Sequence, residues 1–223
     1  MKTVFLFFKK AALFGCVLVV AFACILSARV SLSETRTFVR SFHFLVIETE
    51  HVEAAAGTSS LLGGAGHVMS TGEGVALGVY FALSSAEAAA ANAKKEYPEV
   101  KVVSQGIRKF LFSGKRERGN ADKIIAAFST LYEYLHLIYD ESVRLERGGT
   151  QESSRRLLSG IAKQLAFLGE ENGEVEQTLA KTCRAASGEL SELIEGTIYA
   201  KDLRGFLCVY AENYLSAART YSF

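Results

Sequence analysis

The chain has 223 residues, no tryptophan and a formal net charge of +1. This length allows one or two domains, and the nearly neutral charge argues against a nucleic-acid-binding protein that relies on a strong basic field. Four cysteines are too few for a disulfide scaffold of this size. The totals indicate ordinary globular material, with part of the 49% hydrophobic content gathered in one run near the N-terminus.

Residues 11–28 (AALFGCVLVVAFACILSA) form this apolar run, and it contains no charge. Lys9 and Lys10 precede it and Arg29 follows it. Its length is near the minimum for a helix that crosses about 30 Å of hydrocarbon. The run therefore predicts a transmembrane helix, in preference to a cleaved signal peptide or a lipoprotein signal with its modified residue at Cys16.

The orientation of this helix follows from its flanks. Basic residues lie on both sides, so the short N-terminal segment decides in favour of an N-terminus in the cytoplasm. We expect residues 1–10 to be a cytoplasmic tail and residues 29–41 to be a linker. The predicted localisation is the cell membrane, with a single pass through the lipid bilayer and an extracytoplasmic C-terminal region.

The part of the chain that follows, residues 42–112, mixes strand and helix patterns. Aromatic and β-branched residues alternate in its first segment, FHFLVIETE, which is typical of a strand. A glycine-rich stretch predicts a loop, and an alanine-rich stretch that ends at Pro98 predicts a helix. The expected elements are a strand at 42–50, a loop at 54–66, a strand at 74–83, a helix at 86–97, a strand at 100–104 and an extended segment at 107–112.

Residues 79–103 (VYFALSSAEAAAANAKKEYPEVKVV) carry a resemblance to a known family. A strand, a polar turn, an alanine-rich helix with an AEA start and a valine-rich strand resemble the second half of a SPOR domain, a small bacterial peptidoglycan-binding module. Residues 42–50 match the first strand of that family, so the resemblance covers about 65 residues. The sequence departs from the family at 52–69, because only residues 52–56 favour a helix before the glycines.

The resemblance implies that the module binds glycan strands lacking stem peptides on the open face of its sheet. Members of this family typically carry one N-terminal transmembrane helix and act in division or sporulation. The platform would consist of residues 42–47 and 75–83. Within it His43 and Tyr80 are the expected sugar contacts, because aromatic faces stack on sugar rings and histidine can hydrogen-bond to hydroxyl groups.

Beyond residue 119 the apolar residues recur at spacings of three and four, which indicates amphipathic helices. Four such segments separated by glycine-containing breaks predict an antiparallel helical bundle at residues 120–223. Cys183 and Cys208 fall on neighbouring segments of it, as two buried free thiols or, in an oxidising exterior, as a disulfide. Residues 113–119 are expected to be a basic linker. For the whole basic run at 109–118 (KFLFSGKRER), which includes two aromatic residues, a solvated linker is expected, with contact to an anionic polymer such as teichoic acid as the alternative.

No set of residues with catalytic spacing occurs in the sequence. His43 and His51 flank several glutamates, but their spacing matches no zinc motif. Gly63 to His67 lacks the lysine of a phosphate-binding loop and is better explained as a tight turn. We therefore expect no enzymatic activity, no metal site and no cofactor.

The sequence as a whole predicts an α+β protein: a transmembrane helix, a small SPOR-like or ferredoxin-like module at 42–112 and a helical bundle. The predicted function is non-enzymatic binding of cell-wall peptidoglycan, in division or sporulation. The alternative is a membrane-tethered scaffold that recruits a protein partner through the bundle. No nucleic-acid partner is expected.

Overall fold

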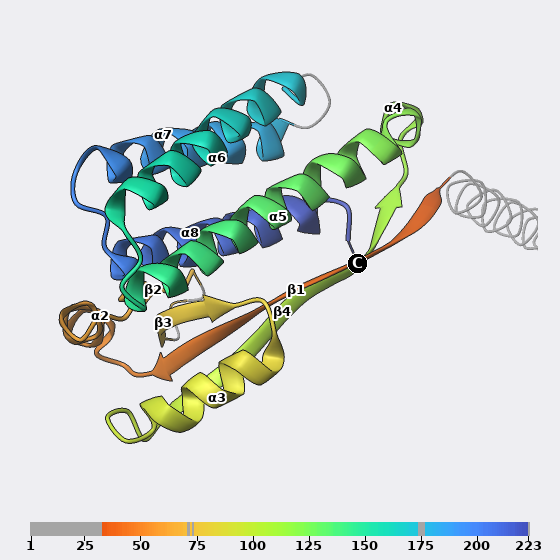
Figure 1. Cartoon of the computed structure of the whole chain (residues 1–223). Helices are drawn as coiled ribbons and strands as arrows, with labels where there is room; N and C mark the ends of the chain where they lie inside the picture. The colour runs from red at the N-terminus through yellow and green to blue at the C-terminus, as the bar shows by residue number, and fades with distance from the viewer. Residues whose placement is uncertain (1–32, 71, 73, 174–176, 223) are drawn as a thin grey trace, which may run out of the picture.

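The computed structural model describes residues 33–222 apart from 71, 73 and 174–176 (Figure 1). The fold is mixed α+β, as the sequence predicted. It is built on a four-stranded antiparallel sheet. Its elements in chain order are β1 (Glu34–Glu48), α2 (Val52–Leu61), β2 (His67–Val68), β3 (Gly74–Tyr80), α3 (Leu83–Ala93), β4 (Val100–Phe112), α4 (Lys115–Gly119), α5 (Ala121–Glu146), α6 (Gln151–Glu171), α7 (Gln177–Glu195) and α8 (Ala200–Arg219).

The sheet has the strand order β2-β3-β1-β4, and every neighbouring pair is antiparallel. Strands β3 and β4 therefore run parallel to each other with β1 between them, and α3 connects them. Likewise α2 connects β1 to β2, with β3 in between. Each half of the sheet is a split strand–helix–strand unit.

The central strand β1 is longer than the sequence predicted. It pairs with β4 from Glu34, opposite Phe112, to Ile47, opposite Val100. Residues 34–41, expected to be a linker, are therefore mostly strand. Phe38 explains this difference, because it is only 4% exposed and its ring stacks on that of Phe110 with 4.4 Å between centroids. The expected extended segment at 107–112 is confirmed as the end of β4.

Helix α2 occupies most of the stretch that was expected to be a glycine-rich loop. Gly57 lies inside the helix, where its cost of about 1 kcal/mol relative to alanine is tolerated. The helix ends at Leu61, and Gly63 follows its C-cap residue with a φ of 85°, the left-handed conformation that glycine adopts most readily. The backbone N–H groups of Gly63 and Gly64 then donate to the carbonyls of Ser60 and Ser59. The sequence prediction erred by treating the first glycine as the helix breaker.

The four predicted bundle helices are α5 to α8, and the short helix α4 lies where a linker was expected. Helices α5 and α8 lie against the sheet, while α6 and α7 form a further layer above them (Figure 1). Cys183 on α7 and Cys208 on α8 are free thiols and fully buried.

The sheet and the bundle share one hydrophobic core. Phe42 and Phe44 of β1 are 0% exposed, and they belong to the same buried cluster as Phe128 of α5 and Tyr214 of α8. The Phe42 and Tyr214 ring centroids lie 5.3 Å apart. Burying one such side chain contributes about 1.5–3 kcal/mol. The sheet face that was expected to be an open platform is therefore the floor of the core.

The opposite face of the sheet carries the other residues of β1, because side chains alternate along a strand. Leu45 and Ile47 pack there with Leu77 of β3 and Ala90 of α3. Helices α2 and α3 both lie on this side, so each face of the sheet is covered by helices.

A partly buried polar contact attaches the β2 region to α8. The Glu212 carboxylate accepts hydrogen bonds from His67 Nε2 at 2.9 Å and from the backbone N–H and hydroxyl of Ser70 at 3.0 and 2.9 Å. Burial opposes ionisation of this carboxyl, but the hydrogen bonds from His67 and Ser70 hold its pKa below the ordinary value.

Within the described part of the chain, none of the helices combines the length and apolarity needed to cross a membrane. The segment 11–28, for which a span was predicted, lies outside the described residues.

Candidate functional site: a cleft between α2 and α3

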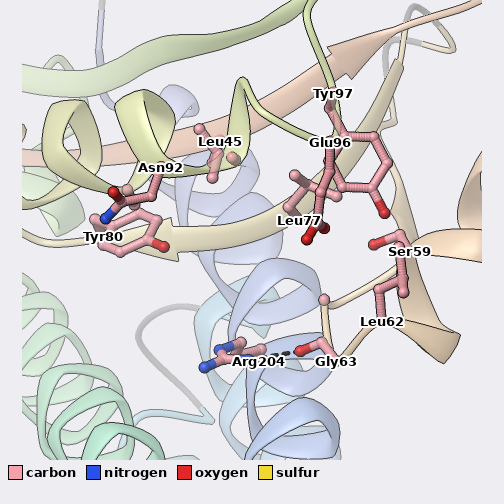
Figure 2. Close-up of a pocket in the computed structure, with 13 residues that line it drawn as sticks. Leu45, Ser59, Leu62, Gly63, Leu77, Tyr80, Asn92, Glu96, Tyr97 and Arg204 are labelled. Atoms are coloured by element: carbon pink, nitrogen blue, oxygen red, sulfur yellow. Dashed lines mark hydrogen bonds between the residues drawn. The ribbon is translucent and has the colours of Figure 1, made fainter.

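A cleft of about 370 Å³ opens on the sheet face that carries α2 and α3 (Figure 2). This volume is within the range of small-molecule sites. Leu45 of β1 and Leu77 of β3 line it on the sheet side. The remaining lining residues come from α2 and the loop after it, from the end of β3, from α3 and the turn after it, and from α8: Ser59, Leu62, Gly63, Gly64, Tyr80, Ala89, Asn92, Ala93, Glu96, Tyr97 and Arg204.

The alanine-rich sequence of α3 helps to explain why the helices do not close over the sheet here. Ala86 and Ala90 are the buried residues of α3, and Ala89 and Ala93 border the cleft. Alanine favours the helix but fills little space beside it. A hollow therefore remains above Leu77, where longer side chains would interdigitate.

Two hydroxyl groups that line this cleft have no hydrogen-bond partner in the structure. Ser59 is 0% exposed, and its Oγ is buried and unpaired. The hydroxyl of Tyr97 is likewise buried and unpaired, and the two hydroxyls point toward each other across one side of the cleft (Figure 2). Burial raises the pKa of Tyr97, so its hydroxyl is a proton donor at neutral pH. Leaving a buried polar group unpaired costs about 1–3 kcal/mol.

Arg204 reaches the cleft from α8 and fixes the loop after α2. Its Nη1 donates to the Gly63 carbonyl at 2.5 Å, and its Nη2 forms an ion pair with Glu146 at the end of α5. Gly64 packs so closely that an added Cβ would overlap Ser59 Oγ. The loop wall of the cleft is therefore held by a contact from the bundle and by one glycine without space for a side chain.

Tyr80 and two polar residues, Asn92 and Glu96, also line the cleft. Tyr80 ends β3 and packs edge-on against Tyr139 of α5, with ring centroids 5.9 Å apart. Burial raises the pKa of Tyr80, and the charge of Arg204 opposes this shift. Asn92 and Glu96 lie on α3 and in the turn after it, and both are exposed.

The lining of the cleft offers groups that can bind a ligand. An apolar floor, tyrosine rings and unpaired hydroxyls fit a neutral, hydroxylated ring with one apolar face. No histidine or cysteine lines the cleft to act as a base or nucleophile beside Ser59. Among the described residues, no group of three or more histidines, cysteines or acidic side chains could hold a metal ion.

The structure brings only one of the two sequence-predicted contacts into this cleft. Tyr80 lines it. His43 is 8% exposed, and its Nδ1 lies 2.7 Å from Ser104 Oγ on the neighbouring strand β4. Burial lowers the pKa of His43, partly offset by Glu87 of α3. His43 is therefore a covered polar residue of the sheet and does not belong to an open platform.

Sequence reasoning missed Ser59, Tyr97 and Arg204. Ser59 lay in a segment expected to be a loop, and Arg204 is far from the others along the chain. Tyr97 precedes Pro98, and this pair marked only the end of a helix. The two adjacent glycines at 63 and 64 were the available signal that a backbone wall approaches another group closely there.

No protein-family model, curated protein or solved structure matches this chain. The fold and the site define its class by themselves: an α+β protein whose sheet is covered on both faces and whose cleft lies between the two helices of one face.

Proposed function

We propose that this chain is a membrane-tethered, non-enzymatic protein that binds bacterial cell-wall glycan, and that one sugar unit of the glycan occupies the cleft between α2 and α3. The proposal keeps the predicted class of ligand and moves its site from the sheet face that α5 and α8 cover to the face that carries α2 and α3.

Two features support the cell-wall assignment. The uncharged run at 11–28 precedes the folded part, as in the layout of SPOR-domain proteins. The strand order β2-β3-β1-β4, with helices between β1 and β2 and between β3 and β4, is the ferredoxin-like order that the SPOR resemblance implies. Helix α2 also corresponds to the first helix of the SPOR family, the element that seemed shortened in this sequence.

The pair of unpaired hydroxyls is the observation that carries the proposal. A sugar ring offers several hydroxyl groups that donate and accept hydrogen bonds, so it would satisfy both Ser59 and Tyr97 once these two buried side chains turn toward the cleft. Its apolar face could lie against a tyrosine ring, and an N-acetyl methyl group would fit over Leu77 and Ala93. Exposed Asn92 and Glu96 offer further polar contacts at the rim.

The experiment that tests this function is retention of the purified full chain on insoluble peptidoglycan, intact or stripped of stem peptides by an amidase. We expect retention to rise on the stripped material. The variants Ser59→Ala and Tyr97→Phe each remove one hydroxyl and should lower retention by roughly five-fold to ten-fold, the effect of one hydrogen bond of about 1–1.5 kcal/mol.

The matched controls are Ser191→Ala and Tyr199→Phe, which remove hydroxyls from α7 and from the residue before α8, away from the cleft. Both should leave retention unchanged. Equal retention of Tyr97→Phe and the unmodified chain would rule out the cleft as the binding site. If the unmodified chain is not retained at all, cell-wall binding itself is ruled out.

A second candidate function is recruitment of a protein partner by α6. Phe167 is 61% exposed and Leu157 is 40% exposed on this helix, which lies in the layer farthest from the sheet (Figure 1). Replacement of both by glutamate, followed by crosslinking in cells, tests it. Loss of a crosslinked partner with unchanged wall retention would establish this second function.

A further inference from the structure

Charge is segregated toward one end of the β1–β4 ribbon. Residues 34–37 and 108–123 hold seven basic and three acidic side chains. The rest of the chain from residue 33 onward holds 14 basic and 21 acidic side chains. Lys109, at the ribbon end, and Lys115, on α4, are both exposed. These two segments thus form a net basic end surface, which borders the acidic Glu171 of α6 beside Lys123, whereas the rest of the chain from residue 33 onward is net acidic.

The acidic residues within this end surface are largely engaged by the protein itself. The Glu117 carboxylate accepts hydrogen bonds from the backbone N–H groups of Ser113 and Gly114, at 3.1 and 3.0 Å. Glu34 pairs with Arg36. Glu34 therefore offsets Arg36, and Asp122 lies near the same guanidinium group. Glu117 keeps its charge, and the surface remains basic because it holds seven basic side chains against three acidic ones.

The same end is where the remainder of the chain is attached. Glu34 is paired with Phe112, the residue directly before the turn into α4. Only residues 29–32 separate the uncharged run 11–28 from the described part. Four extended residues reach about 14 Å, so a span at 11–28 would keep the basic end surface within roughly one or two Debye lengths of the bilayer at 0.1 M salt.

We propose that this basic end surface, formed by residues 34–37 and 108–123, docks on anionic phospholipid headgroups and sets the orientation of the protein on the membrane. Lys109 and Lys115 supply exposed charge to the contact. The docking rests on the membrane tether of the proposed function, and it is independent of what occupies the cleft. Polybasic segments beside a membrane anchor are attracted to anionic lipids in this way.

The test uses the full chain in nanodiscs of phosphatidylcholine, with or without added phosphatidylglycerol. A fluorophore on Ser113→Cys reports contact through quenching by lipids that carry brominated headgroups. Cys16 and Cys24 are replaced by alanine. The native Cys183 and Cys208 are fully buried, and burial raises the pKa of Cys183 to about 12 and that of Cys208 further, so neither competes for the label.

We expect quenching to rise by roughly two-fold or more when phosphatidylglycerol is present, and to fall back at high salt. The variant Lys109→Glu/Lys115→Glu should abolish the rise. Lys94→Glu/Lys95→Glu, a matched reversal of exposed lysines at the end of α3, should not. The salt dependence is measured on the labelled chain without charge reversals, so the test does not depend on the folding of any reversal variant.

Equal quenching in the two lipid mixtures would overturn the docking while leaving the tether intact. Failure of the chain to enter nanodiscs would instead count against the tether. A label that responds to soluble polyglycerol phosphate and not to the lipid would assign the surface to a wall polymer, and it would also overturn the proposal.

Discussion

At the scale of single residues, the cleft hydroxyls connect stability to binding. Tyr97→Phe removes an unpaired buried hydroxyl and leaves the ring in place. We expect it to raise the free energy of unfolding by up to about 1 kcal/mol, because the penalty for the unpaired group disappears, while retention on glycan falls. Thermal unfolding of the free protein measures the first effect. A destabilised variant would mean that the hydroxyl has a partner, such as a bound water molecule.

Glu212 makes the free energy of unfolding depend on pH in the acid range. Its pKa in the folded protein lies below the ordinary value of 4.5, so its hydrogen bonds stabilise the fold above that pH. This stabilisation is lost as the pH falls through the lower, folded value. Glu212→Gln should cost about 1–3 kcal/mol at neutral pH and should flatten the decline in stability below pH 4.5.

Urea unfolding between neutral and acid pH measures this prediction. The control is Glu192→Gln, a change at an exposed position on α7, which should leave the curve unchanged. A variant at Glu212 with the same acid decline as the unmodified chain would show that other groups cause the decline.

At the scale of elements, two glycines of the α2 region should respond in opposite directions. Gly57 lies inside the helix with no atom near an added Cβ, so Gly57→Ala should stabilise the protein by about 1 kcal/mol. Gly63 has a φ of 85°, so Gly63→Ala should destabilise it by about 1–2 kcal/mol. Denaturant unfolding of both variants measures the difference. Equal changes in the free energy of unfolding for the two variants would mean that Gly63 does not lie just beyond the end of α2.

The same region shows how far periodicity alone can predict elements. The apolar spacing of α5 to α8 is long and regular, so all four helices were predicted. Strand β1 was also predicted, but its first residues, 34–41, are polar on one side. Their pairing with β4 and the contact between Phe38 and Phe110, both distant in sequence, place them in the strand. Local patterns cannot reveal such a contact in advance.

At the scale of the whole molecule, the shared core predicts cooperative unfolding. Phe128 of α5 lies between the sheet and α8 and is 0% exposed. We expect Phe128→Ala to cost about 3–5 kcal/mol and to weaken hydrogen-exchange protection in β1 and α8 together. Protection lost in α8 alone would indicate that the sheet and the bundle fold as separate units.

The cleft was less predictable than the elements because it is assembled from five separate parts of the chain. The residues of the α3 region, such as Asn92 and Tyr97, lay in a segment whose strand–helix pattern was recognised. Ser59 and Arg204 meet it only through the course of the loop after α2 and the packing of α8. The sequence also gave no sign that α5 and α8 cover the sheet face that the predicted platform required.

The central strand β1 has a mechanical consequence. Its first residue, Glu34, lies at the end where the chain emerges, whereas Leu45 lines the cleft some 11 residues further on, or about 36 Å along an extended strand. Under the proposed function, a pull between the tether and a ligand in the cleft would act along β1, which pairs with β4 from Glu34 to Ile47 and with β3 from His43 to Glu48. Such a load shears many backbone hydrogen bonds at once and does not open them one by one. The strand would then carry tension between the proposed tether and the cleft.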